Sequence, residues 1–223
     1  MAKIKFTIIT LFKEALEPYL NTSMMWKAQD KGLAEFDFVN LRDFGLGPHK
    51  SVDDTPYGGG DGMLLRCEPV FNAIESVKEK DPEAKVILPT PVGEIWNQEK
   101  AREFANVKDD ETKHFIILCP HYEGYDERIL SIVDYKISLG KFVLTGGELP
   151  ALTIVDSVVR LIPGVLGGET SAEIESFSDG DNLEYPQYTK PYDFRGMTVP
   201  DILLSGNHGE VDKWRAEHSK RAD

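Results

Sequence analysis

Residues 139–168 read LGKFVLTGGELPALTIVDSVVRLIPGVLGG and place a glycine turn between an apolar segment and a helix. Gly146 and Gly147 form the turn, and Pro150 suits the first helical turn because its missing N–H costs nothing there. A helix is predicted over residues 150–162, and Pro163-Gly164 ends it. Apolar residues recur along it at helical spacing: Leu152, Val155, Val158, Val159 and Ile162.

The glycine turn has two interpretations. A turn without side chains lets a ligand approach the backbone closely and exposes N–H groups at the start of the helix. The same turn is also compatible with a purely structural role, as the entry to a buried helix. This stretch alone favours the structural role.

Elements outside this stretch alternate between strand and helix. Strands are predicted at residues 3–10, 34–39, 86–88, 114–119 and 135–138. Helices are predicted at residues 21–31, 69–80 and 97–106, with a short one at 126–131. This alternation indicates an α/β fold with a mostly parallel sheet and helices on both of its faces.

Length and composition predict one core of ordinary size plus a small appendage, because 41% of the 223 residues are hydrophobic. A formal charge of −13 counts against nonspecific binding to polyanions. Residues 168–185 carry acids and no Lys or Arg, whereas residues 186–223 are neutral. Two cysteines without metal-type spacing indicate an intracellular chain, and residues 6–12 are too short for a signal peptide or membrane span.

Three further features are candidates for chemistry. Residues 42–66 form a long predicted loop with a glycine run at 58–62, but no Walker or dinucleotide motif surrounds it. Residues 119–124, CPHYEG, follow an apolar strand, where open α/β sheets bind ligands. Arg160 lies one helical turn after Asp156, so an ion pair is one explanation for a charge on this apolar helix.

Seven motifs then occur in order: HKSVDDTPYGGGDGM, HYEGYDER, LGKFVLTGGELPAL, VVRLIPGVLGG, SFSDG, YPQYTKP and LLSGNH. Together they resemble the bacterial tRNA (guanine-N1)-methyltransferases, the TrmD family. The resemblance extends from Lys3 to about Trp214, nearly the whole chain.

The resemblance implies a SPOUT-type domain with a trefoil knot over residues 1–166, an acidic flexible linker at 167–184, and a small helical tRNA-binding domain at 185–223. It implies a cytoplasmic homodimer with active sites shared between subunits, and no membrane association. The cosubstrate would be S-adenosylmethionine, with Mg²⁺ as a possible cofactor and no metal ligands assigned. The substrate would be tRNA with guanines at positions 36 and 37, methylated at N1 of guanine 37.

Site residues follow from the same resemblance. Those implied to bind S-adenosylmethionine are Leu88, Pro89, Thr90, Pro91, Pro120, Tyr122, Glu123, Leu139, Gly140, Lys141, Phe142, Val143, Leu144, Gly146 and Gly147. Those implied to bind tRNA are Asp53, Asp54, Tyr57, Gly58, Gly59, Ser171, Lys190 and His208.

The implied chemistry is methyl transfer with Glu175 as the general base and Arg160 as the stabiliser of charge on the guanine O6. The family uses aspartate where this chain has Glu175, and glycine is usual at Pro120. The C-terminal domain is also shorter than usual. There are two alternatives. One is a dimeric module that binds S-adenosylmethionine without catalysis, and the other is a SPOUT enzyme that acts on another RNA position.

Overall fold

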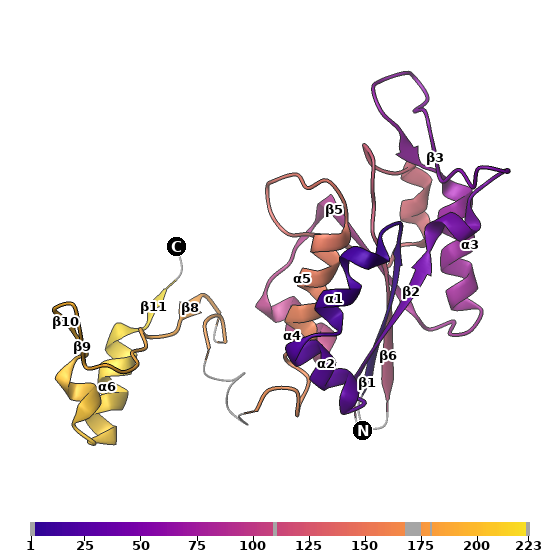
Figure 1. Cartoon of the computed structure of the whole chain (residues 1–223). Coiled ribbons are helices and arrows are strands. Elements are labelled where there is room, and N and C mark those ends of the chain that lie inside the picture. Colours follow the sequence, from indigo (N-terminus) through magenta and orange to yellow (C-terminus); the bar gives the residue numbers. More distant parts are fainter. Residues whose placement is uncertain (1–2, 109–110, 168–174, 179, 222–223) are drawn as a thin grey trace. The chain divides into compact units, whose positions relative to one another are not determined.

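The computed structural model describes residues 3–108, 111–167, 175–178 and 180–221. The chain divides into two compact units, Met1–Leu166 and Gly167–Asp223 (Figure 1). The described residues include no helix that is both long and apolar enough to cross a membrane.

The first unit is built on a five-stranded parallel sheet with the strand order β2-β1-β6-β5-β7. Its strands are β1 (Lys3–Thr10), β2 (Ala34–Asn40), β5 (Lys85–Ile95), β6 (Thr112–Leu118) and β7 (Tyr135–Ser138). Each strand occurs where the sequence predicts one, so the predicted parallel sheet is confirmed. Because all the strands run the same way, their carboxyl ends meet at one edge of the sheet.

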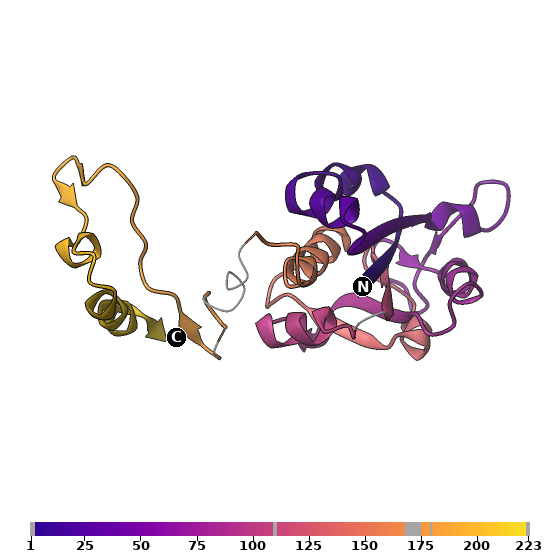
Figure 2. The ribbon, with the colours of Figure 1, turned by 90° about the horizontal axis from the view of Figure 1, so that it is seen from below.

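Helices cover both faces of this sheet, as predicted (Figures 1 and 2). One face packs against α1 (Glu17–Leu20), α2 (Ser23–Asp30), α4 (Gln98–Ala105) and α5 (Glu148–Val159), and the 3₁₀ helix η1 (Lys13–Ala15) precedes α1. The other packs against α3 (Cys67–Lys78), η2 (Leu41–Phe44) and η3 (Glu127–Ile132).

Strand periodicity divides the apolar side chains between two cores. On β6, Phe115 and Ile117 face the α5 side, whereas Ile116 and Leu118 face the α3 side. All four are almost completely buried. Burying each such side chain contributes roughly 1.5–3 kcal/mol, so both cores hold β6 at the centre of the sheet.

Strand β5 is longer than the predicted strand at 86–88. It pairs with β7 up to Pro89, which lies opposite Ile137, and then pairs with Ile137 again through Glu94. The residues between bulge out of the ladder. A Cβ on Gly93 would lie 2.4 Å from the Ile137 backbone nitrogen, so only glycine lets the strand return to its partner.

The predicted loop at 42–66 contains short β pairings. Strands β3 (Asp53–Asp54) and β4 (Leu64–Leu65) are antiparallel to each other. The β4 segment also binds residues 123–126: Glu123 N donates to Met63 O at 3.0 Å, and Leu65 N donates to Gly124 O at 2.9 Å. The glycine run at 58–62 is therefore anchored to the residues that follow β6.

The second unit consists of short elements. Strand β8 (Asn182–Leu183) pairs with β11 (Lys220–Arg221), and β9 (Asp193–Phe194) pairs with β10 (Met197–Thr198). Two helices, η4 (Asp201–Leu204) and α6 (His208–His218), follow one another. Asn207 caps α6 by accepting from Glu210 N, and the Trp214 ring stacks 4.1 Å from His218.

Candidate functional site

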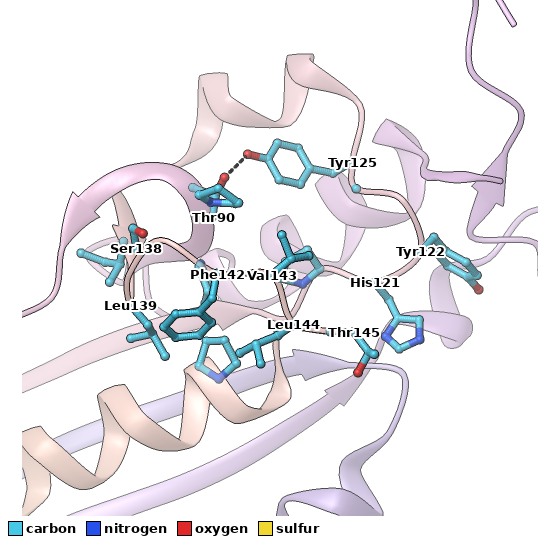
Figure 3. A pocket seen from close by; sticks show the side chains of 18 of the residues that line it. Thr90, His121, Tyr122, Tyr125, Ser138, Leu139, Phe142, Val143, Leu144 and Thr145 are labelled. Carbon is cyan, nitrogen blue, oxygen red and sulfur yellow. Dashed lines mark hydrogen bonds between the residues drawn. The ribbon is translucent and has the colours of Figure 1, made fainter. Parts of the chain in front are cut away.

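A pocket lies at the carboxyl ends of β5, β6 and β7, where the segment that follows β7 returns to the start of α5 (Figure 3). Its lining comes from three stretches of the chain, residues 89–91, 120–125 and 137–150. The lining residues are Pro89, Thr90, Pro91, Pro120, His121, Tyr122, Glu123, Gly124, Tyr125, Ile137, Ser138, Leu139, Gly140, Phe142, Val143, Leu144, Thr145, Gly146, Gly147 and Pro150.

Gly147 joins the start of α5 to the end of β6. Its N–H donates to Pro120 O at 2.8 Å. A Cβ at this position would lie 2.4 Å from Pro120 Cδ and 2.6 Å from Cys119 Cα. The missing side chain is therefore required by backbone packing, which supports the structural interpretation of the glycine turn.

The segment between β7 and α5 exposes apolar side chains. Phe142 is 56% exposed and Val143 is 88% exposed, although both line the pocket. Leu149, in the first turn of α5, is 62% exposed. Side chains of this kind gain free energy when another molecule covers them.

His121, which lines the pocket, lies near two further polar side chains, Thr10 and Glu148. Glu148 accepts a hydrogen bond of 2.8 Å from the Thr10 hydroxyl, and its other carboxylate oxygen lies 4.0 Å from His121 Nδ1. That nitrogen is buried and has no hydrogen-bond partner among the described residues. Figure 3 shows His121 beside Thr145, while the Phe12 ring packs 5.0 Å from the imidazole. The buried nitrogen of His121 thus lies near a carboxylate oxygen.

Tyr122 and Glu123 connect the pocket to the glycine-rich loop. Tyr122 adopts a positive φ of 65°, which is uncommon for a residue with a side chain. Burial raises the pKa of its phenol, and the negative charge of Asp53 raises that pKa further. The Glu123 side chain fills the space beside Gly62, where a Cβ would lie 2.4 Å from Glu123 Cγ.

Most of the residues predicted to bind S-adenosylmethionine line this one pocket. Leu88 and Lys141 do not: Leu88 is buried in the core on the α3 side, and Lys141 is exposed on the segment after β7. Seven lining residues were not predicted as site residues: His121, Gly124, Tyr125, Ile137, Ser138, Thr145 and Pro150. Their place at the ends of strands could have identified most of them, because parallel sheets bind ligands there. His121, Gly124 and Tyr125 follow β6, and Ile137 and Ser138 end β7.

The predicted catalytic pair belongs to different units. Arg160 is the C-cap of α5, and its N–H donates to Asp156 O at 3.1 Å. The carboxylate of Asp156 accepts a hydrogen bond of 2.9 Å from the Tyr19 hydroxyl. Glu175 lies in the second unit, where its carbonyl accepts from Ser178 N at 3.0 Å.

The predicted tRNA-binding residues are spread over both units. Asp53 and Asp54 form β3, and Asp54 pairs with Arg66 at 3.3 Å. Tyr57, Gly58 and Gly59 are exposed in the loop after it. Lys190 and His208 are exposed in the second unit, whereas Ser171 lies outside the described residues.

The described residues contain no group of three or more His, Cys, Asp or Glu side chains that could hold a metal ion. The donor set that Mg²⁺ prefers is therefore not assembled there.

Comparison with known proteins gives a consistent result. The family model described as tRNA (Guanine-1)-methyltransferase TrmD matches residues 4–223. A tRNA (guanine-N(1)-)-methyltransferase of Staphylococcus epidermidis is 50% identical over 215 residues, which is 96% of this chain and 85% of the relative. Another from Citrifermentans bemidjiense is 51% identical over 219 residues, covering 98% and 86%.

A solved structure agrees with these relatives. The crystal structure of tRNA (m1G37) methyltransferase from Aquifex aeolicus superposes with a TM-score of 0.78 at 38% identity, covering 97% of this chain and 89% of that chain. The fold, the pocket at the ends of β5 to β7 and the near-full-length matches therefore agree. The chain belongs to the TrmD family of tRNA (guanine-N1)-methyltransferases.

Proposed function

We propose that this chain transfers the methyl group of S-adenosylmethionine to N1 of guanine 37 in tRNA that also has guanine at position 36. The observation that carries the proposal is the apolar pocket at the carboxyl ends of β5, β6 and β7. Its walls combine proline and glycine turns with exposed apolar side chains. Adenine presents an apolar face and a hydrogen-bonding edge, which such walls and their backbone groups suit.

S-adenosylmethionine supplies an electrophilic methyl group on a sulfonium. Guanine N1 carries a proton at neutral pH, so a base must remove it before N1 can attack. Glu175 takes that proton in this proposal. Arg160 stabilises the negative charge that develops on the guanine O6. Arg160 cannot act as the base because a guanidinium keeps its proton in proteins.

The substrate RNA would contact both units. The loop that carries Asp53, Asp54 and Tyr57 leads through β4 to the pocket wall at residues 123–126, so RNA held there would lie near the cosubstrate. Ser171 belongs to the proposed linker. Lys190 and His208 would contribute from the C-terminal domain. Because the chain is acidic overall, recognition would depend on local contacts and not on net charge.

A homodimer completes the proposed site. Phe142 and Val143 in the pocket wall and Leu149 in the first turn of α5 expose apolar surface, and a second copy of the chain would cover part of it. Each active site would then include residues of both subunits. The enzyme would act in the cytoplasm, where tRNA is modified. No step is assigned to Mg²⁺, since the described residues offer no suitable donor set.

Transfer of a labelled methyl group tests this function. The enzyme is incubated with labelled S-adenosylmethionine and with tRNA transcripts that carry G36-G37, G36-A37 or A36-G37. Label is expected only in the first transcript, at N1 of guanine 37. Binding without transfer would favour the non-catalytic module, and label at another nucleotide would favour a different SPOUT enzyme.

A further inference from the structure

Two hydroxyl groups face each other in the wall of the pocket. The Thr90 Oγ1 and the Tyr125 hydroxyl oxygen are 2.8 Å apart, and both residues line the pocket. Figure 3 shows the two side chains pointing toward one another from β5 and from the segment after β6. Pro89, Pro91 and Ile137 surround this part of the wall.

Both hydroxyls are held in place by the fold. Thr90 is 6% exposed and lies where β5 leaves its ladder with β7. Tyr125 pairs with Leu65, and hydrogen bonds of 2.9 Å lie on either side of it, from Leu65 N to Gly124 O and from Asp126 N to Leu65 O. Its ring also packs against the core on the α3 side. A pair held this way is preorganised for a ligand.

The proton count leaves one donor available. Two hydroxyls carry two protons, and their mutual hydrogen bond uses one of them. A phenol is the more acidic group and the better donor, so Tyr125 donates and Thr90 accepts. Within the described parts of the chain, Thr90 Oγ1 has no second partner, so its own proton can bind a ligand. The bond from Tyr125 polarises that hydroxyl and strengthens it as a donor.

We propose that Thr90 is a specificity-determining residue that donates a hydrogen bond to a ring nitrogen of the cosubstrate's adenine, and that Tyr125 positions it. The inference rests on the proposed function, because it takes the pocket as the S-adenosylmethionine site. Thr90 lies between two proline rings, whose flat apolar surfaces suit a purine face. The charged groups of the ligand suit the opposite, polar end of the pocket, near His121 and Glu123.

Binding of S-adenosylhomocysteine and its 1-deaza, 3-deaza and 7-deaza analogues, measured by calorimetry, tests this assignment. In the parent protein, one deaza analogue should bind about five- to tenfold more weakly than S-adenosylhomocysteine. Thr90→Val should weaken the binding of S-adenosylhomocysteine by the same factor. It should bind that deaza analogue no more weakly than the parent protein does. Thr90→Ser, which keeps the hydroxyl, should restore the discrimination.

Tyr125→Phe keeps the ring but removes the donor to Thr90. The preference for S-adenosylhomocysteine over that deaza analogue should therefore fall to about two- to threefold. Tyr135→Phe is the matched control on β7, outside the pocket lining, and should change neither affinity nor discrimination. A ribose-deoxy analogue is included as a separate arm. Discrimination that survives in Thr90→Val, equal binding of all the ring analogues by the parent, or discrimination of the ribose instead would each overturn the proposal.

Failure of the proposed function is distinguishable from these outcomes. If the parent protein does not bind S-adenosylhomocysteine, the pocket assignment itself is wrong. If binding is normal but Thr90→Val retains full discrimination, the pocket stands and only the role of Thr90 is overturned. Thermal unfolding of each variant shows whether an affinity change reflects a damaged fold.

Discussion

The Thr10 hydroxyl donates a hydrogen bond of 2.8 Å to the Glu148 carboxylate, which joins the end of β1 to the first turn of α5. The Glu148 side chain is only 13% exposed, so the oxygen that accepts this bond has little access to water. The carboxylate also lies at the positive end of the α5 dipole. This bond thus ties the sheet to the helix that carries one side of the pocket.

Thr10→Val should lower the free energy of unfolding by about 1–3 kcal/mol, because a partly buried carboxylate oxygen loses its donor. The same substitution also removes the acceptor of Phe12 N. Thr153→Val, on an exposed part of α5, should change stability by less than about 0.5 kcal/mol. Denaturant unfolding measures both, and equal values for the two variants would contradict the expectation.

Gly147→Ala should destabilise the first unit by about 1–3 kcal/mol, since the added Cβ would overlap Pro120 and the Cys119 backbone. Gly147→Val should be worse and should also abolish S-adenosylmethionine binding in whatever fraction folds. Gly167→Ala is the control because no atom of the described residues lies within 4 Å of its added Cβ. Unchanged cosubstrate affinity in a folded Gly147→Val protein would count against the pocket.

Glu175→Gln should reduce single-turnover methyl transfer about 10²-fold or more while leaving S-adenosylmethionine affinity intact, because the base is lost and the size is kept. Glu175→Asp should retain activity. Glu184→Gln removes another acid of the second unit and should have little effect. Parental turnover in Glu175→Gln would move the search for the base to Glu123 and to Asp179, which lies outside the described residues.

Arg160→Lys should also slow transfer, because lysine keeps the charge but lacks the planar fork that binds a developing oxyanion. The effect should appear in the turnover rate, with cosubstrate affinity unchanged. Lys213→Arg, the reverse exchange on α6, serves as a control. A parental rate in Arg160→Lys would show that charge alone is sufficient at this position.

The proposed homodimer predicts a particle of twice the 25.0 kDa chain mass in light scattering at micromolar concentration. Leu149→Glu should shift the equilibrium to monomer, because it places a charge in the proposed interface. Leu204→Glu changes a similarly exposed leucine of the second unit and should leave the dimer intact. A stable monomer of the parent protein would rule out the interface.

Acid should weaken the contact between β1 and the edge strand β2. Lys3 and Lys5 lower the pKa of Glu35 from 4.5 to about 2, and Lys5 Nζ lies 2.8 Å from the carboxylate. A lowered folded-state pKa contributes stability above the unfolded value of 4.5, and this stability is lost as the pH falls toward 2. Over that range, unfolding free energy should fall more steeply in the parent than in Glu35→Gln. Parallel curves would refute this.

Sequence patterns were sufficient for the sheet because its strands are apolar and separated by helices of ordinary length. They were insufficient for β5, since Pro89 and Pro91 indicate the end of a strand, whereas pairing with β7 resumes beyond them. The short strands β3 and β4 were not predicted, because two residues are too few to show the alternation of a strand. The trefoil knot stays a prediction.

The pocket was predicted in outline from the resemblance, but its polar details were not. Neither Tyr125 nor Thr10 has a sequence signal for its hydrogen bond, because the partners Thr90 and Glu148 are distant along the chain. The resemblance implied that Leu88 belongs to the pocket, whereas strand alternation turns its side chain into the core.

The pocket walls come from β5, β6, β7 and α5. The ribosome must therefore synthesise residues up to about Pro150 before the whole pocket can form. A ligand held by these segments together has no binding site on the unfolded chain. By mass action, a hundredfold excess over the dissociation constant would add about 2.7 kcal/mol to the stability of the first unit. Cellular cosubstrate supply would therefore influence how long this protein survives proteolysis, as well as how fast it works.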